Sequence, residues 1–160
     1  MRFSTMFFER GSFDRGFHVY VSRVKSEAKG VLFYVGRTGD HSSPNAGSVF
    51  ARFSAHLNPK SKGNALTRNL AKQGLTPGLC DFDVFAFGPI HQEQASFELH
   101  RPKRDEVEAI EFEVACALKG MGCNVIGSHQ CSTPLPEHLR PLVAKFLDAV
   151  RDHFNLARAA

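Results

Sequence analysis

Two neighbouring segments near the N-terminus have the residue pattern of a β-hairpin, and this pattern limits the folds open to the chain. Residues 17–24 (FHVYVSRV) alternate apolar and polar side chains, the two-residue period of a half-buried strand. Residues 31–37 (VLFYVGR) have the composition of a second strand. The link from Arg23 to Gly30 is short and polar, so the two strands are expected to pair antiparallel.

The chain has only two tyrosines, and each falls in one of these segments, as Tyr20 and Tyr34. Its bulk aromatic residue is phenylalanine, with 15 Phe and no Trp. A buried phenol needs a hydrogen-bond partner that a phenylalanine does not need. This favours a chemical role for the two hydroxyls, and the alternative is that the tyrosines are cross-strand packing partners.

The remaining elements follow from periodicity and turn residues. Residues 80–87 alternate as a third strand, which the apolar second half suggests is buried on both faces. Apolar residues at helical spacing predict helices at about 47–57, 65–73, 92–100, 104–119 and 137–156. The chain is therefore expected to be one α/β (α+β) domain over residues 1–160, a small three-stranded antiparallel sheet flanked by helices. Its core would cover about 17–127, with an extra amphipathic helix at about 137–156.

The apolar stripe on the C-terminal helix allows two interpretations. The first is docking on the core of the same chain, and the second is a homodimer contact. The stripe consists of Leu139, Leu142, Val143, Phe146, Leu147, Val150 and Phe154.

Charge and hydropathy restrict the possible partners. The formal net charge of +4 permits a polyanionic partner such as nucleic acid without requiring one. No apolar stretch approaches the length of a membrane span, and the N-terminus is too charged for a signal peptide, so a cytoplasmic protein without a membrane partner is expected. Basic residues form two groups that are either solvated faces or rims of a phosphate-binding groove. These are Lys60, Lys62, Arg68 and Lys72, then Arg101, Lys103 and Arg104.

The four cysteines are Cys80, Cys116, Cys123 and Cys131. Their spacing, together with His129 and His138, matches no common zinc template, so reduced structural thiols are favoured. Cys116 lies in an apolar helical run and is expected to be buried. The histidines His91, His100, His129 and His153 are interpreted as surface or structural residues.

Residues from later segments could join the two tyrosines in one site. Arg52 and His56 are four residues apart and therefore share a face of the helix at 47–57. Glu111 lies on the helix at 104–119, and Asn124 follows the end of that helix.

With these residues in this order along the sequence, the chain resembles the GIY-YIG nuclease family over about residues 17–127. The first family motif appears as His18-Val19-Tyr20 and the second as Tyr34-Val35-Gly36. An R-x-x-x-H helix, a glutamate and a late asparagine follow. The segment leading to His56, with a strand after it, is most similar to the restriction-endonuclease-like branch. His18 departs from the family pattern, because it stands where the family has its first glycine, and it could place an extra base near Tyr20.

The resemblance implies a DNA endonuclease that uses Mg²⁺ (or Mn²⁺) and hydrolyses phosphodiester bonds by in-line attack of water. A divalent cation neutralises charge in such a reaction, and Mg²⁺ needs few protein ligands. Glu111 would be the metal ligand, with Glu108 as the runner-up and Glu113 a further acidic neighbour. Asn124 would tie the loop after its helix to the sheet.

The other family residues would act on the phosphate and the water. Arg52 offers a forked donor to phosphate oxygens, with Arg37 as its rival. Tyr34 would donate a hydrogen bond to the phosphate or to the attacking water. Tyr20 would be the general base or its close assistant, helped by His56 or His18, because a free phenol titrates near 10. The alternative function is a catalytically silent nucleic-acid-binding module of the same fold, and a scaffold using the C-terminal helix has less support.

Overall fold

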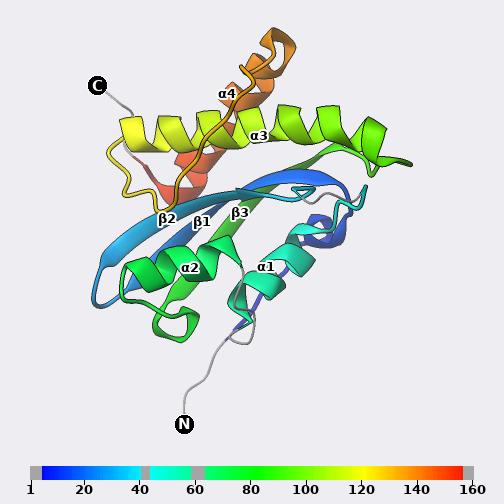
Figure 1. The fold of residues 1–160 in the computed structure, drawn as a ribbon. Helices are drawn as coiled ribbons and strands as arrows, with labels where there is room; N and C mark the ends of the chain where they lie inside the picture. The colour runs from blue at the N-terminus through cyan, green and yellow to red at the C-terminus, as the bar shows by residue number, and fades with distance from the viewer. Residues whose placement is uncertain (1–4, 41–43, 59–63, 157–160) are drawn as a thin grey trace.

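The computed structural model describes residues 5–40, 44–58 and 64–156 (Figure 1). Within these ranges the chain forms a mixed α/β fold, with one three-stranded antiparallel sheet and four α-helices. The strands are β1 (Phe17–Ser26), β2 (Gly30–Arg37) and β3 (Asp81–His91), and their order in the sheet is β2-β1-β3. The predicted three-stranded antiparallel sheet flanked by helices is confirmed at this level.

The predicted hairpin is also confirmed, with a tighter turn than expected. β1 continues to Ser26, so only residues 27–29 connect the strands. In the register of the pair, Tyr20 lies opposite Gly36 and Ser22 lies opposite Tyr34. The two tyrosines are therefore diagonal neighbours on one face of the sheet, within reach of each other.

β1 occupies the centre of the sheet and is buried on both faces, which corrects the prediction of a half-buried strand. Phe17, Val19 and Val21 belong to one core cluster, while Tyr20 and Val24 belong to the other. The polar residues of the alternation are thus also buried, because helices cover both faces. Helices α3 and α4 lie on one face and α1 and α2 on the other (Figure 1).

The prediction that the third strand is buried on both faces is wrong. Every residue of β3 is partly or fully exposed, and the strand runs to His91 rather than ending at Phe87. Among the described strands, β3 pairs only with β1 and forms an edge of the sheet, so its apolar side chains are covered incompletely.

Two capped helices cover the face that carries the tyrosines. α1 (Val49–Leu57) begins after Ser48, whose side chain accepts a hydrogen bond from the Ala51 amide. α2 (Ala65–Lys72) begins after Asn64, whose side chain accepts from the Thr67 amide. Such caps satisfy amides that have no partner inside the helix. Both helices match the predicted positions within two residues.

α3 (Phe97–Gly120) is a single helix where two were predicted, and the helix predicted at 92–100 is wrong. The gap between the two predicted helices contains Pro102, and the residue before a proline disfavours the helical conformation. Pro102 lies inside α3 and removes one backbone donor. Burial of Val107, Ile110 and Val114 on the sheet holds the helix together beyond it.

Cys116 on α3 is exposed, which corrects the expectation that it is buried. The buried positions around it are Val114, Ala115 and Leu118. Successive helix residues turn by about 100°, so Cys116 points away from the face that these three residues bury.

α4 (Arg140–Phe154) follows a short 3₁₀ turn at Glu137–Leu139, so the helix begins later than predicted. Val143, Phe146, Val150 and Phe154 are buried in the same cluster as the sheet. The apolar stripe therefore docks on the core of its own chain, and the structure gives no support to a homodimer contact through these residues.

Candidate active site

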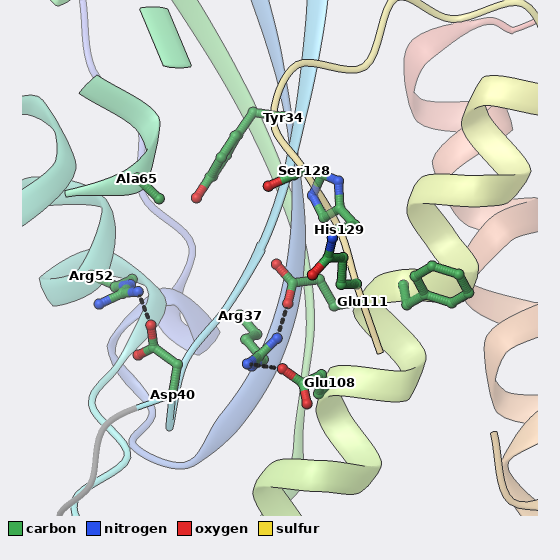
Figure 2. Close-up of a pocket in the computed structure, with 11 residues that line it drawn as sticks. Tyr34, Arg37, Asp40, Arg52, Ala65, Glu108, Glu111, Ser128 and His129 are labelled. Carbon is green, nitrogen blue, oxygen red and sulfur yellow. Dashed lines mark hydrogen bonds and ion pairs between the residues drawn. The ribbon is translucent and has the colours of Figure 1, made fainter. Parts of the chain in front are cut away.

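A pocket of about 280 Å³ lies at the C-terminal end of β2 and collects charged and polar side chains (Figure 2). They come from β2, the loop after it, α1, α3 and the segment after α3. The polar lining residues are Tyr34, Arg37, Asp40, Arg52, Glu108, Glu111, Ser128, His129 and Gln130. Three of the five predicted catalytic residues, Tyr34, Arg52 and Glu111, therefore line one pocket.

The pocket reaches both faces of the sheet by passing the end of β2. Tyr34 belongs to the core cluster on the α1 and α2 side. Glu111 comes from α3, which covers the other face. Figure 2 shows Tyr34 and Glu111 directed into the same space. The phenol and the carboxylate therefore line the same pocket, although Tyr34 faces the α1 and α2 side of the sheet and Glu111 comes from α3 on the other side.

One guanidinium holds both carboxylates proposed as metal ligands. Arg37 Nη2 donates to Glu108 Oε1 at 2.7 Å, and Arg37 Nη1 contacts Glu111 Oε2. Burial raises the pKa of Glu111, and the charge of Arg37 opposes that effect. Both terminal nitrogens of Arg37 are thus engaged by carboxylates, which weakens its candidacy as a phosphate ligand.

Arg52 lies on the opposite wall, in contact with Asp40 (Figure 2). Burial lowers the pKa of Arg52, but the charge of Asp40 and the two tyrosines outweigh burial and raise the pKa above its usual value. The guanidinium is therefore held as a fixed cation on the tyrosine side of the pocket.

Tyr20 and His56 form a buried pair beside the pocket but are absent from its lining. The Tyr20 hydroxyl lies 2.8 Å from His56 Nε2, and Tyr20 is 0% exposed. The pKa of Tyr20 is raised well above its usual value, first by burial and then by Tyr34. Burial and the charge of Arg52 lower the pKa of His56 to about 4. The structure thus supports the role of close assistant for Tyr20 better than direct contact with substrate.

His18 does not provide the extra base near Tyr20 that the sequence allows. Its Nδ1 lies 3.1 Å from the carbonyl oxygen of Gly16. Its ring packs so tightly against Gly88 that a Cβ there would come within 2.5 Å. Among the described residues, His56 is the histidine that contacts the Tyr20 hydroxyl.

Gly36 is required because Tyr20 occupies the space beside it. A Cβ at position 36 would lie 2.5 Å from the Tyr20 hydroxyl oxygen and 2.6 Å from Cζ. We expect Gly36→Ala to displace Tyr20, break its hydrogen bond to His56 and lower the free energy of unfolding by about 1–3 kcal/mol. Urea denaturation measures the loss. Gly47→Ala is the control, because nothing lies within 4 Å of its Cβ. Equal stability of the two variants would contradict the close contact.

Buried histidines predict that stability falls in mild acid. The pKa of His56 is lowered from 6.5 to about 4, so between these values the unfolded chain binds the proton more readily than the folded one. His56 alone should cost on the order of 1–2 kcal/mol at pH 5. Burial also lowers the pKa of His18, His91 and His129, which adds in the same direction, while the raised pKa of Glu111 acts against it.

Urea denaturation at pH 7.5 and pH 5.0 measures this dependence. His56→Gln should remove part of it, because glutamine does not titrate. Equal free energies of unfolding at the two pH values would contradict the buried neutral imidazole.

Asn124 lies where the segment after α3 is tied to β2, but the tie is made by backbone groups, so the predicted role of its side chain stays a prediction. Its carbonyl oxygen accepts from the Phe33 amide at 2.8 Å, and the Ile126 amide donates to the Phe33 carbonyl oxygen at 2.8 Å. Asn124 itself is exposed. The segment after α3 is thereby tied to β2, which places Ser128 and His129 at the pocket.

The predicted nucleic-acid-binding residues are only partly placed. Arg68 and Lys72 are exposed on α2, one and two turns after Ala65, which lines the pocket. Lys60 and Lys62 lie outside the described residues. In the second basic group, Lys103 and Arg104 pair with acidic neighbours on α3, Glu106 and Asp105.

Sequence reasoning missed residues that only the fold brings to the site. Asp40 follows a turn-forming glycine, and Asn64 precedes a helix as a cap, so each had an ordinary local explanation. His129 was interpreted as structural, and its Nε2 does bond the Val35 carbonyl oxygen at 3.1 Å. It also lines the pocket. The sequence signal that could have identified His129 was its position shortly after Asn124.

The acidic residues suit a hydrated divalent cation in chemistry, though not as a closed cage. Carboxylate oxygens are the ligands that Mg²⁺ prefers, and it keeps most of its waters. Among the described residues, no cluster of three His, Cys, Asp or Glu side chains forms a metal site, so one or two carboxylates would have to suffice. Glu111 and Glu108 are the fitting pair, and a cation there would share them with Arg37.

Comparisons with known proteins give no family for this chain. No protein-family model, curated protein or solved structure matches it. None of the helices among the described residues is both long and apolar enough to cross a membrane.

Proposed function

We propose that this protein is a divalent-metal-dependent endonuclease of GIY-YIG type, which hydrolyses phosphodiester bonds in DNA by in-line attack of water. One observation carries the proposal. Tyr34, Arg52 and Glu111, three residues from distant segments that the motif order singles out, line the same pocket. Three such side chains, carried by three different elements, would not be expected to line one pocket by chance.

The walls of the pocket divide the chemical work. The guanidinium of Arg52 offers its fork of N–H groups to the phosphate oxygens and stabilises the charge that develops on them. Tyr34, 5% exposed, offers its hydroxyl to the same phosphate or to the attacking water. Glu111, with Glu108 beside it, would hold Mg²⁺ or Mn²⁺. When bound, such a cation neutralises charge on the phosphate and the leaving oxygen.

Tyr20 and His56 form the proton-accepting pair behind this wall. The high pKa of Tyr20 makes the phenol a poor base alone. Contact with the neutral imidazole of His56 at 2.8 Å gives its proton a place to go. Because Tyr20 does not line the pocket, it would receive the proton of the attacking water through a second water, without forming a free phenolate.

The alternative is a module of the same fold that binds nucleic acid without cutting it. One observation favours it: Arg37 and Arg52 are each held by carboxylates, so the site is internally neutralised. A labelled oligonucleotide distinguishes the two functions when binding, by fluorescence anisotropy, and cleavage, on a denaturing gel, are followed in the same sample. Mg²⁺, Mn²⁺ and a chelator are compared. Cation-dependent products support the endonuclease, and binding without products supports the module.

A further inference from the structure

The side-chain amide of Asn64 has an orientation set by contacts that do not involve an imidazole. Its Oδ1 accepts a hydrogen bond from the Thr67 backbone amide at 2.8 Å, where Asn64 caps α2. Its Nδ2 donates to the carbonyl oxygens of Ala55 and His56 at 3.2 and 3.3 Å. In the reverse orientation the NH₂ group would face the Thr67 N–H, donor against donor. The amide oxygen would face the carbonyl oxygens of Ala55 and His56, acceptor against acceptor. Oδ1 is therefore the atom that faces the ring of His56.

This orientation determines where the ring of His56 carries its proton. His56 Nδ1 lies 3.2 Å from Asn64 Oδ1. An amide oxygen can only accept, so Nδ1 must be the donor. In a neutral imidazole the other nitrogen then holds the lone pair. That nitrogen, Nε2, lies 2.8 Å from the Tyr20 hydroxyl, which must donate to it.

We propose that Asn64 is a positioning residue that fixes His56 as the neutral Nδ1–H tautomer, and so makes His56 Nε2 the acceptor for the proton of Tyr20. The tautomer follows from the contacts alone, while its use in catalysis rests on the proposed endonuclease function. The three side chains form a directional chain from β1 through α1 to the first residue before α2. Thr67 adds support, because its hydroxyl donates to the His56 carbonyl oxygen at 2.8 Å.

In hydrolysis, the proton released by the attacking water would pass along Tyr20 and His56. An O–H bond of the attacking water breaks, and its proton passes through a second water to the Tyr20 oxygen, which does not line the pocket, while the proton of Tyr20 passes to His56 Nε2. The water oxygen uses its electron pair to form the new P–O bond. The leaving oxygen departs with the electron pair of the broken P–O bond. Asn64 Oδ1 keeps the ring in place as His56 becomes an imidazolium, which later returns its proton to solvent or to the leaving oxygen.

The surroundings of His56 keep the ring neutral before the reaction. Within the described part of the chain, the titratable or charged groups near it are Tyr20 on β1, Tyr34 on β2, Arg52 on α1 and Asp40 after β2. Burial and Arg52 lower the pKa of His56, while the bond to Asn64 and the charge of Asp40 oppose them. Near neutral pH the lone pair on Nε2 is therefore available in essentially every molecule.

Two substitutions separate positioning from capping. Asn64→Asp keeps an acceptor that reaches both the Thr67 amide and His56 Nδ1, but it replaces the donor to the Ala55 and His56 carbonyl oxygens with a second carboxylate oxygen, so it should lose some stability. Asn64→Ser keeps a good helix cap, but its side chain is too short to reach the ring. Both should therefore fold, and thermal denaturation checks this. Only Asn64→Ser should release the tautomer.

The direct test is the ¹⁵N NMR signature of the His56 ring, which needs no substrate. In the wild type and in Asn64→Asp we expect a protonated-type Nδ1 resonance and an unprotonated-type Nε2 resonance. In Asn64→Ser we expect the two resonances to move toward each other, as the tautomers mix. An Nε2–H tautomer in the wild type, or an unchanged Nδ1–H tautomer in Asn64→Ser, would overturn the proposal.

Cleavage measurements then connect the tautomer to function. We expect Asn64→Ser to lose about 10²-fold in cleavage rate, as for removal of an oriented general base. Asn64→Asp should stay within about tenfold of the wild type at pH 8. As the pH is lowered, the cleavage rate of Asn64→Asp should begin to fall at a higher pH than that of the wild type. The reason is that a carboxylate beside His56 raises the pKa of the ring by about 1 or more.

The outcomes distinguish the two proposals. If the wild type cuts no nucleic acid but shows the Nδ1–H tautomer, the endonuclease function fails and the positioning role of Asn64 stands. If the wild type cuts DNA and Asn64→Ser cuts equally fast, the positioning role fails and the endonuclease function stands.

Discussion

Glu111→Gln is expected to reduce DNA cleavage by roughly 10³-fold or more while the protein remains folded. The carboxylate of Glu111 is the better buried of the two that could hold the cation, with its side chain 14% exposed against 29% for Glu108. A catalytic cation contributes several kcal/mol to the transition state, and each 1.4 kcal/mol is about tenfold in rate. Single-turnover cleavage of a labelled duplex, with and without Mn²⁺, measures the loss.

The substitution is mild for the fold, because Arg37 retains its bond to Glu108 at 2.7 Å and no buried cation is stranded. Glu113→Gln is the matched control. Glu113 lies on the same helix but lines a different cavity, together with Cys131, and its variant should cut like the wild type. A Glu111→Gln protein that cuts within threefold of the wild type would contradict the assignment. A larger loss in Glu108→Gln would move the metal ligand to Glu108.

Tyr20→Phe is expected to cost about 10²–10⁴ in cleavage rate, the range for loss of an acid–base group. The variant removes one oxygen from a fully buried ring and leaves His56 Nε2 without its 2.8 Å partner. The ring itself still fills its site, so the loss of stability should be about 1–3 kcal/mol. Cleavage rate and urea denaturation together separate the two effects.

Ser22→Ala provides a control on the same strand. Ser22 is also fully buried, and its hydroxyl oxygen has no hydrogen-bond partner among the described residues. Its variant should therefore cut normally. Tyr20→Phe and His56→Gln should each slow cleavage, and the double variant should be little worse than either, since the two residues act as one unit. Additive losses, or a Tyr20→Phe protein as active as Ser22→Ala, would contradict a shared proton path.

Local sequence patterns were sufficient for most elements of this fold, and they failed where tertiary packing decides. Alternation and polar turns predict β1 and β2, because both signals reside in a few consecutive residues. The pattern could not place β1 at the centre of the sheet, so it missed the burial of the polar residues on that strand. The continuation of α3 past Pro102 depends on burial of residues beyond the proline, which no local rule contains.

The candidate site divides in the same way. Motif order predicts that Tyr34, Arg52 and Glu111 belong together, and all three line the pocket. The sequence does not show that Arg37 pairs with Glu111 or that Arg52 pairs with Asp40, because these partners lie far apart in the chain or on different elements. Asn64 was also beyond reach, since its role as a helix cap explains it fully until the ring of His56 is placed beside it.

The central claim is that the pocket at the end of β2 hydrolyses phosphodiester bonds with the help of a divalent cation. Incubation of the wild-type protein with supercoiled plasmid and with single-stranded DNA, in Mg²⁺, in Mn²⁺ and in chelator, tests it most directly. We expect nicked or linear plasmid, or shortened single strands, only when a cation is present. Intact DNA in every condition, or cleavage that continues unchanged in chelator, would contradict the claim.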